Sequence, residues 1–115
     1  MLLTKQINKS ENLSQHTVKA LSKNLNIAIA KANDADYLSE KGIKSSQEGV
    51  FCRNLILTRY VNSPLVYGES LYQDNINESA WLNSCNYVAY GYKVPERIHS
   101  VAKSYLEAVL KYFNK

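Results

Sequence analysis

The chain has 115 residues, a net charge of +4 and 45% apolar residues. These values are typical of one globular domain and exclude a disordered or collagen-like chain. No run of 18 apolar residues occurs, and the N-terminus lacks the apolar core of a signal peptide. We therefore expect a single soluble cytoplasmic domain over residues 1–115, with no membrane segment.

The first predicted helix begins near Asn12, a suitable N-cap with Gln15 in the capping-box position. Its apolar residues recur at helical spacing and fall on one narrow stripe. Asn33 and Asp34 would end it, and a further turn of helix is expected from Asp36 to Lys41, before Gly42. The stripe consists of Val18, Leu21, Leu25, Ala28, Ile29 and Ala32.

The next segments are ambiguous. After a loop over residues 43–49, residues 50–61 and 65–72 are rich in β-branched and aromatic side chains and are separated by Asn62-Ser63-Pro64. They are interpreted as a β-hairpin, with a pair of helices as the alternative because Ser63-Pro64 can also start a helix. The stretch RNLILTRYVNSPLVYGESLYQ (residues 53–73) resembles the strand–turn–strand pattern of chorismate lyase and related effector-binding domains. That resemblance implies two strands here and no particular function.

Two more helices follow. One is expected from an Asn77 cap to about residue 90, with a stripe that includes Trp81 and Cys85 and with Gly91 ending it in a left-handed conformation. The last begins just after Pro95, and its apolar residues, Leu106 among them, cover more than half its circumference. The sequence thus predicts a small, predominantly helical α+β domain with three main helices and one β-hairpin, or alternatively an all-α fold.

No complete catalytic or metal-binding motif is present. The residues His16, Cys52, Cys85 and His99 are a formal zinc set, but they lie 36, 33 and 14 residues apart, whereas structural zinc sites use close ligand pairs. Both cysteines are expected to be reduced, unbridged and buried. Cys85 and His99 therefore make a poor nucleophile pair, and the close carboxylates Asp34 and Asp36 have no specific spacing. We predict neither a cofactor nor an enzymatic activity.

Tyrosine is the unusual feature of the composition. The chain holds nine Tyr beside two Phe and one Trp, and Tyr is enriched at protein interfaces. On the helix expected to end near residue 90, Tyr87 and Tyr90 fall opposite the apolar stripe, and Tyr92 follows. We predict that these three residues contact a partner, although a neighbouring element covering both helix faces would also explain them.

Charge suggests the rival hypothesis. Residues 1–33 carry five Lys against one Glu, and residues 79–115 carry five bases against two acids, which would attract an acidic partner. The candidate basic surface consists of Lys19, Lys23, Lys93 and Arg97. The first hypothesis, based on the tyrosines, is a protein-binding module that contacts another protein or a second copy of itself. It would be an accessory or inhibitor protein of a phage, plasmid or toxin–immunity locus. The alternative is a nucleic-acid-binding accessory protein.

Overall fold

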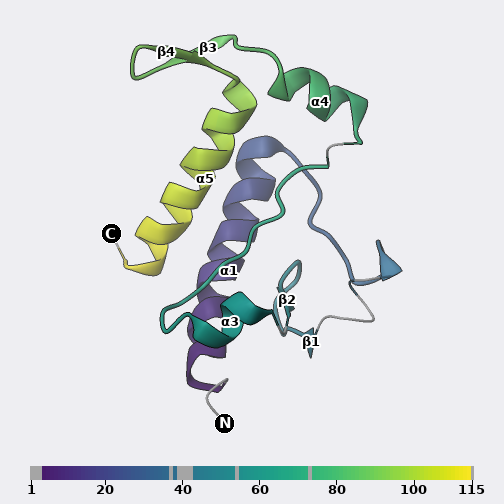
Figure 1. Cartoon of the computed structure of the whole chain (residues 1–115), viewed down its shortest axis with the longest axis vertical. Helices are drawn as coiled ribbons and strands as arrows, with labels where there is room; N and C mark the ends of the chain where they lie inside the picture. The colour runs from purple at the N-terminus through teal and green to yellow at the C-terminus, as the bar shows by residue number, and fades with distance from the viewer. Residues whose placement is uncertain (1–3, 37, 39–42, 54, 73, 115) are drawn as a thin grey trace.

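The computed structural model describes residues 4–36, 38, 43–53, 55–72 and 74–114. Two long helices, α1 (Thr4–Leu25) and α5 (Glu96–Tyr112), lie against each other, with the chain running in opposite directions along them (Figure 1). The shorter elements are α3 (Ile56–Tyr60), α4 (Ile76–Leu82) and the antiparallel strand pairs β1 (Ile43–Lys44) with β2 (Phe51–Cys52) and β3 (Tyr87–Ala89) with β4 (Tyr92–Val94). The prediction of a mainly helical α+β domain is confirmed.

Helix α1 lies earlier in the chain than expected. It begins at Thr4, so Asn12 is inside it rather than at its start. It ends at Leu25 because Asn26 takes a left-handed conformation, φ 53°, and the N–H of Ile27 donates back to the Ser22 carbonyl at 3.2 Å. This is the hydrogen bond of a Schellman C-cap. The apolar periodicity of residues 28–32 therefore continues into a loop, where Ile29 lies beside Val18 and Gly49.

The hairpin predicted for residues 50–72 is wrong, and so is the pair of helices. Residues 51–52 pair instead with residues 43–44, inside the stretch expected to be a loop. The Thr58 hydroxyl donates to the carbonyls of Arg53 and Leu55 and accepts from the Leu55 N–H, which favours the single helical turn of α3. Residues 61–72 have no regular structure, and two of them bond to the long helices: the N–H of Leu65 donates to Ser10, and Ser70 bonds Tyr105.

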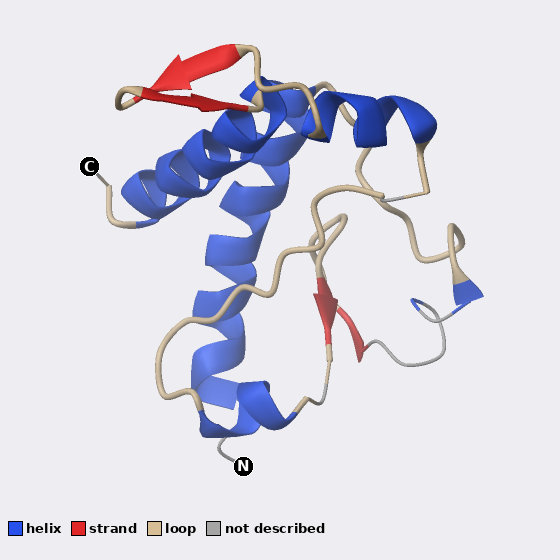
Figure 2. Ribbon diagram, turned by 45° about the horizontal axis from the view of Figure 1, so that its top comes forward, coloured by secondary structure: helices blue, strands red, loops and turns tan. Residues whose placement is uncertain are grey.

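The expected turn at residues 36–41 lies mostly outside the described residues; Asp36 and Leu38 are helical. The helix expected from Asn77 to about residue 90 is real but short. It begins at Ile76, with the Asn75 side chain accepting the N–H groups of Asn77 and Glu78, and it stops at Leu82. Residues 87–94, whose first part was expected to be helical, form the β3–β4 hairpin (Figure 2).

The expectation for α5 is confirmed in position and wrong in orientation. The helix begins directly after Pro95 as expected. The residues it buries against α1 are Ser104 and Ala108, whereas Leu106, placed in the core by the helical pattern, is 59% exposed. The widest apolar side of the helix therefore faces away from α1.

The core of the described residues is small. Its buried apolar residues are Leu21, Leu25, Val50 and Ala108. The chain exposes 8935 Å², whereas a compact protein of 13.1 kDa exposes roughly 6,400 Å². Its radius of gyration is 15.4 Å, against about 13 Å for a compact domain of this length. The molecule thus leaves far more surface uncovered than its length requires.

Candidate functional site

The three candidate tyrosines lie on the β3–β4 hairpin. The strands pair Tyr87 with Val94 and Ala89 with Tyr92, and Tyr90 and Gly91 form the two-residue turn between them with φ 51° and 84°. Positive φ at both positions is what a type I′ turn requires, and its twist matches that of the two strands. Gly91 is thus left-handed as expected, but in a hairpin turn rather than at a helix end.

The hairpin has two different sides. Alternation along the strands places Tyr87, Ala89, Tyr92 and Val94 on one side and Val88 with Lys93 on the other. Tyr87 stacks on His99 of α5 with ring centroids 4.4 Å apart, so its side of the hairpin is turned toward α5. Tyr92 and Val88 are both exposed, and Tyr90 at the tip is 97% exposed. The structure therefore brings Tyr87, Tyr90 and Tyr92 together on one projecting element.

Tyr90 combines full exposure with an unfavourable backbone conformation. Among the described residues, the other non-glycine positions with positive φ are Asn26 and Asn114, and Asn is the residue that tolerates this region best. For a bulky residue a left-handed conformation costs about 1–2 kcal/mol. An exposure of 97% means that packing does not offset this cost.

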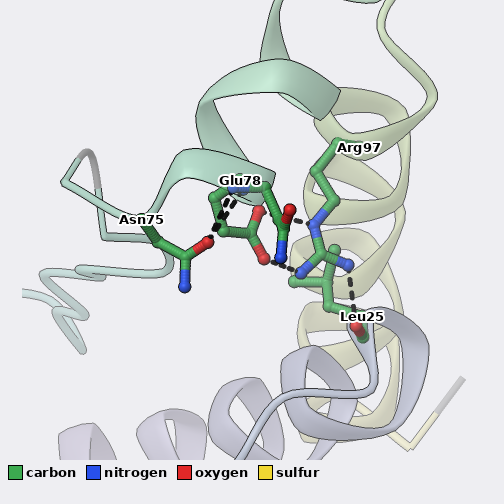
Figure 3. A network of polar contacts seen from close by, with 5 residues as sticks. Leu25, Asn75, Glu78 and Arg97 are labelled. Atoms are coloured by element: carbon green, nitrogen blue, oxygen red, sulfur yellow. Dashed lines mark hydrogen bonds and ion pairs between the residues drawn. The ribbon is translucent and has the colours of Figure 1, made fainter.

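Of the four residues of the candidate basic surface, Arg97 does not lie on the surface. Lys19 and Lys23 are exposed on α1, and Lys93 is exposed on β4. Arg97 points inward: it ion-pairs with Glu78 of α4 through two nitrogens, and its third donates to the Leu25 carbonyl at 2.7 Å (Figure 3). That carbonyl belongs to the negative end of the α1 dipole, where a cation is favoured. Arg97 therefore joins three helices and is not available to an outside anion.

A shallow hollow of about 260 Å³ lies beside this cluster. The Trp81 ring sits on one of its walls, with the guanidinium carbon of Arg97 5.0 Å from the ring centroid. Its lining holds one carboxylate, Glu96, with no His, Cys or second carboxylate, and Arg97 is neutralised by Glu78 outside the lining. The lining residues therefore give no pair suited to nucleophilic or acid–base chemistry. The lining residues are Asn24, Trp81, Ser84, Asn86, Glu96, Arg97 and Ser100.

The cysteines are unbridged, as predicted. They are not buried as expected: Cys52 is half-buried in β2, and Cys85 is exposed in the loop after α4 because that helix stops before reaching it. Burial, with a smaller contribution from the carboxylate of Glu11, raises the pKa of the Cys52 thiol, which makes it a poor nucleophile at neutral pH.

Within the described ranges, no three His, Cys, Asp or Glu side chains gather into a group that could hold a metal ion.

A second exposed surface, the outer face of α5, was not predicted. This outer face consists of Ile98, Ala102, Leu106, Val109, Leu110 and Phe113, all exposed. The signal for it in the sequence is the width of the apolar arc, which is more than one neighbouring helix can cover. The Glu78–Arg97 pair has no such signal, because the two residues are 19 positions apart on separate helices.

Comparison of the chain with family models, with curated proteins and with solved structures found no match. The resemblance of residues 53–73 to chorismate lyase is not supported by the fold either, since its described residues form α3 and irregular chain rather than two strands. None of the helices in the described part of the chain is both long and apolar enough to cross a membrane.

Proposed function

We propose that this protein is a protein-binding module that contacts its partner through the β3–β4 hairpin. The observation that carries the proposal is Tyr90, a bulky residue held at φ 51° and 97% exposed at the tip. Asn or Gly would stabilise this turn better. Local strain that the fold itself does not need is a feature of functional sites.

The chemistry around Tyr90 fits a protein partner. Val88 and Tyr92 lie near it on opposite sides of the hairpin and are exposed, so each side carries an exposed apolar or aromatic residue next to the phenol at the tip. Tyrosine supplies large contact area with few rotatable bonds and is enriched among the residues that dominate binding energy. Such a module would act as an accessory or inhibitor protein by covering a surface of its target.

The test exploits the opposite effects expected on stability and binding. Tyr90→Asn should raise the free energy of unfolding by about 1 kcal/mol, because Asn tolerates the left-handed conformation. The same change should lower partner affinity by about 2 kcal/mol, or roughly thirtyfold, if Tyr90 is a binding hot spot. Thermal unfolding measures the first quantity, and affinity capture from the source organism followed by titration of the captured protein measures the second.

Tyr67→Asn is the matched control, because Tyr67 is also exposed but lies in the irregular chain before α4. Partner capture should survive in this variant. If Tyr90→Asn and Tyr67→Asn retain the partner equally, the hairpin is not the contact surface. If Tyr90→Asn lowers stability, the tyrosine packs on the fold and its conformation is not a source of strain.

Nucleic-acid binding is the second candidate, favoured by three exposed lysines, Lys9, Lys19 and Lys23, on α1. Their side of the helix lies opposite Leu21 and Leu25 at 100° per residue. Binding through phosphates should weaken steeply with salt, and replacing Lys19 and Lys23 by Ala should reduce the salt slope by about one unit for each lysine that binds a phosphate. A salt-insensitive complex that resists nuclease would exclude this candidate and leave the hairpin proposal.

A further inference from the structure

The outer face of α5 is a continuous apolar surface on the side of the helix turned away from α1. Its five large residues, Ile98, Leu106, Val109, Leu110 and Phe113, have exposed fractions between 40% and 63%. Monomers rarely expose large contiguous apolar patches, and such patches mark interaction sites. The whole chain exposes 8935 Å² against roughly 6,400 Å² for a compact protein of its mass, and the outer face of α5 is part of that excess.

We infer that the outer face of α5 is covered by a second copy of this chain, with the two α5 helices antiparallel about a two-fold axis near Leu106. This inference goes beyond the hairpin proposal, and neither depends on the other. A two-fold interface joins the same patch of both chains, so the patch must be complementary to itself. Three properties of the outer face meet that condition.

The first property is the spacing of the residues. Leu106 lies eight residues after Ile98 and seven before Phe113, so it is close to the middle of the face. An antiparallel copy therefore brings Ile98 level with Phe113 of the second chain and Leu106 level with its own equivalent. Small Ala102 then comes level with Val109 and Leu110, which pairs small side chains with large ones as close helix packing requires.

The second property is the charge along one flank. Lys103 and Glu107 lie on either side of the middle and already form an ion pair 3.8 Å long within one chain. In the antiparallel arrangement the long side chain of Lys103 comes within reach of Glu107 of the second chain, and the reverse pair forms by symmetry. The two helix dipoles also oppose each other in this orientation. Flanking charges of this pattern set the partner and its direction in helix pairs.

The third property is the available area. A stable interface takes about 800 Å² from each partner, so residues beyond the outer face of α5 must contribute to it as well. Figures 1 and 2 show the β3–β4 hairpin projecting at the N-terminal end of α5, away from α1. Its α5-facing side, with Tyr92, would meet the Phe113 end of the second helix, while Tyr90 at the tip and Val88 on the opposite side stay exposed for another partner. Aromatic side chains bury about 150–250 Å² each, so these residues extend the interface beyond the two helices.

The test is sedimentation equilibrium of the purified chain over a wide concentration range. We expect a reversible two-chain species whose melting temperature rises with concentration. Leu106→Asp should weaken association by about a hundredfold or more, because the residue occurs twice in the interface. Its exposure of 59% means that the monomer fold should survive, which circular dichroism checks. Ile76→Asp, a matched change at an exposed apolar residue of α4, should remain a dimer.

The orientation is tested separately with introduced cysteines. In a chain with Cys52→Ser and Cys85→Ser, Leu106→Cys should form a disulfide with its own equivalent on mild oxidation. Ile98→Cys should not cross-link alone but should do so when mixed with Phe113→Cys. A wild-type chain that stays monomeric at every concentration, or an Ile98→Cys variant that cross-links with itself, overturns the inference. Tyr90→Asn should leave the dimer intact, so failure of the hairpin proposal is distinguished from failure of this one.

Discussion

The two long sides of α5 differ in a way that reverses the usual rule for helices. The side against α1 buries Ser104, which is fully buried, and Ala108, whereas the opposite side exposes Leu106 and Phe113. Asn24 of α1 donates to the Ser104 hydroxyl at 3.1 Å and to the Glu107 carboxylate at 2.9 Å. The interface between the two helices is therefore small and hydrogen-bonded, and the large apolar residues lie outside it.

On α5, which side chains are buried depends on their size and their hydrogen bonds more than on their hydrophobicity. Small side chains allow two helices to approach closely, and a buried hydroxyl is tolerated because its hydrogen bonds are made. Ser104 also donates to the Ser100 carbonyl at 2.7 Å. No buried side-chain nitrogen or oxygen of the described residues is without a hydrogen-bond partner. The outer side of α5 is exposed within the chain, which is why we assign it to a second copy.

The largest loss of stability is expected from breaking the Glu78–Arg97 ion pair, which lies at one end of the α1–α5 interface. Glu78→Ala removes the carboxylate from a largely buried guanidinium, and leaving a buried charge unpaired destabilises a protein by about 3–5 kcal/mol. The side chains of Arg97 and Glu78 are only 13% and 9% exposed, so solvent cannot replace the pair. Urea unfolding followed by circular dichroism measures the change. The exposed Glu48→Ala is the control, and an equal decrease in stability for the two variants would mean that the pair does not hold the helices together.

An intermediate loss of stability is expected when an alanine of α5 is replaced by leucine on the side against α1, but not on the outer face. Ala108→Leu should destabilise the chain by about 1–3 kcal/mol, because the site is 1% exposed and has no room for a larger side chain. Ala102→Leu, on the outer face, should change the free energy of unfolding by about 0.5 kcal/mol or less. Both are measured at the lowest workable protein concentration, where self-association does not contribute. The reverse order of effects would show that α5 is rotated on its axis.

The smallest effect concerns the hydrogen bonds of the α1–α5 interface. Ser104→Ala keeps the size of the buried residue and removes its hydroxyl, which should cost about 0.5–1.5 kcal/mol. Asn24 would still donate to Glu107, which limits the destabilisation. Lys103→Ala breaks only an exposed ion pair, 3.8 Å long, and should cost less than about 0.5 kcal/mol. Denaturant unfolding of both variants should rank them in this order, and equal midpoints would contradict it.

Some features of this protein follow from local sequence because their causes are local. Pro95 fixes the start of α5, since proline suits the first turn of a helix and cannot continue one from behind. Gly91 takes the left-handed conformation predicted for it, φ 84°. The mainly helical α+β class was predictable for the same reason, because apolar periodicity near 3.6 residues is strong in α1 and α5.

Tertiary structure decided the rest. Residues 87–94 continue the apolar pattern of α4, yet they form a hairpin whose Tyr87 stacks on His99, a residue of α5. Residues 65–72 have strand-forming composition, yet their Leu65 and Ser70 bond to Ser10 and Tyr105 of the two long helices. The side of α5 that is buried depends on Asn24, 80 residues away from Ser104. Periodicity reports how wide the apolar face is, but only the position of α1 decides which part of it is covered.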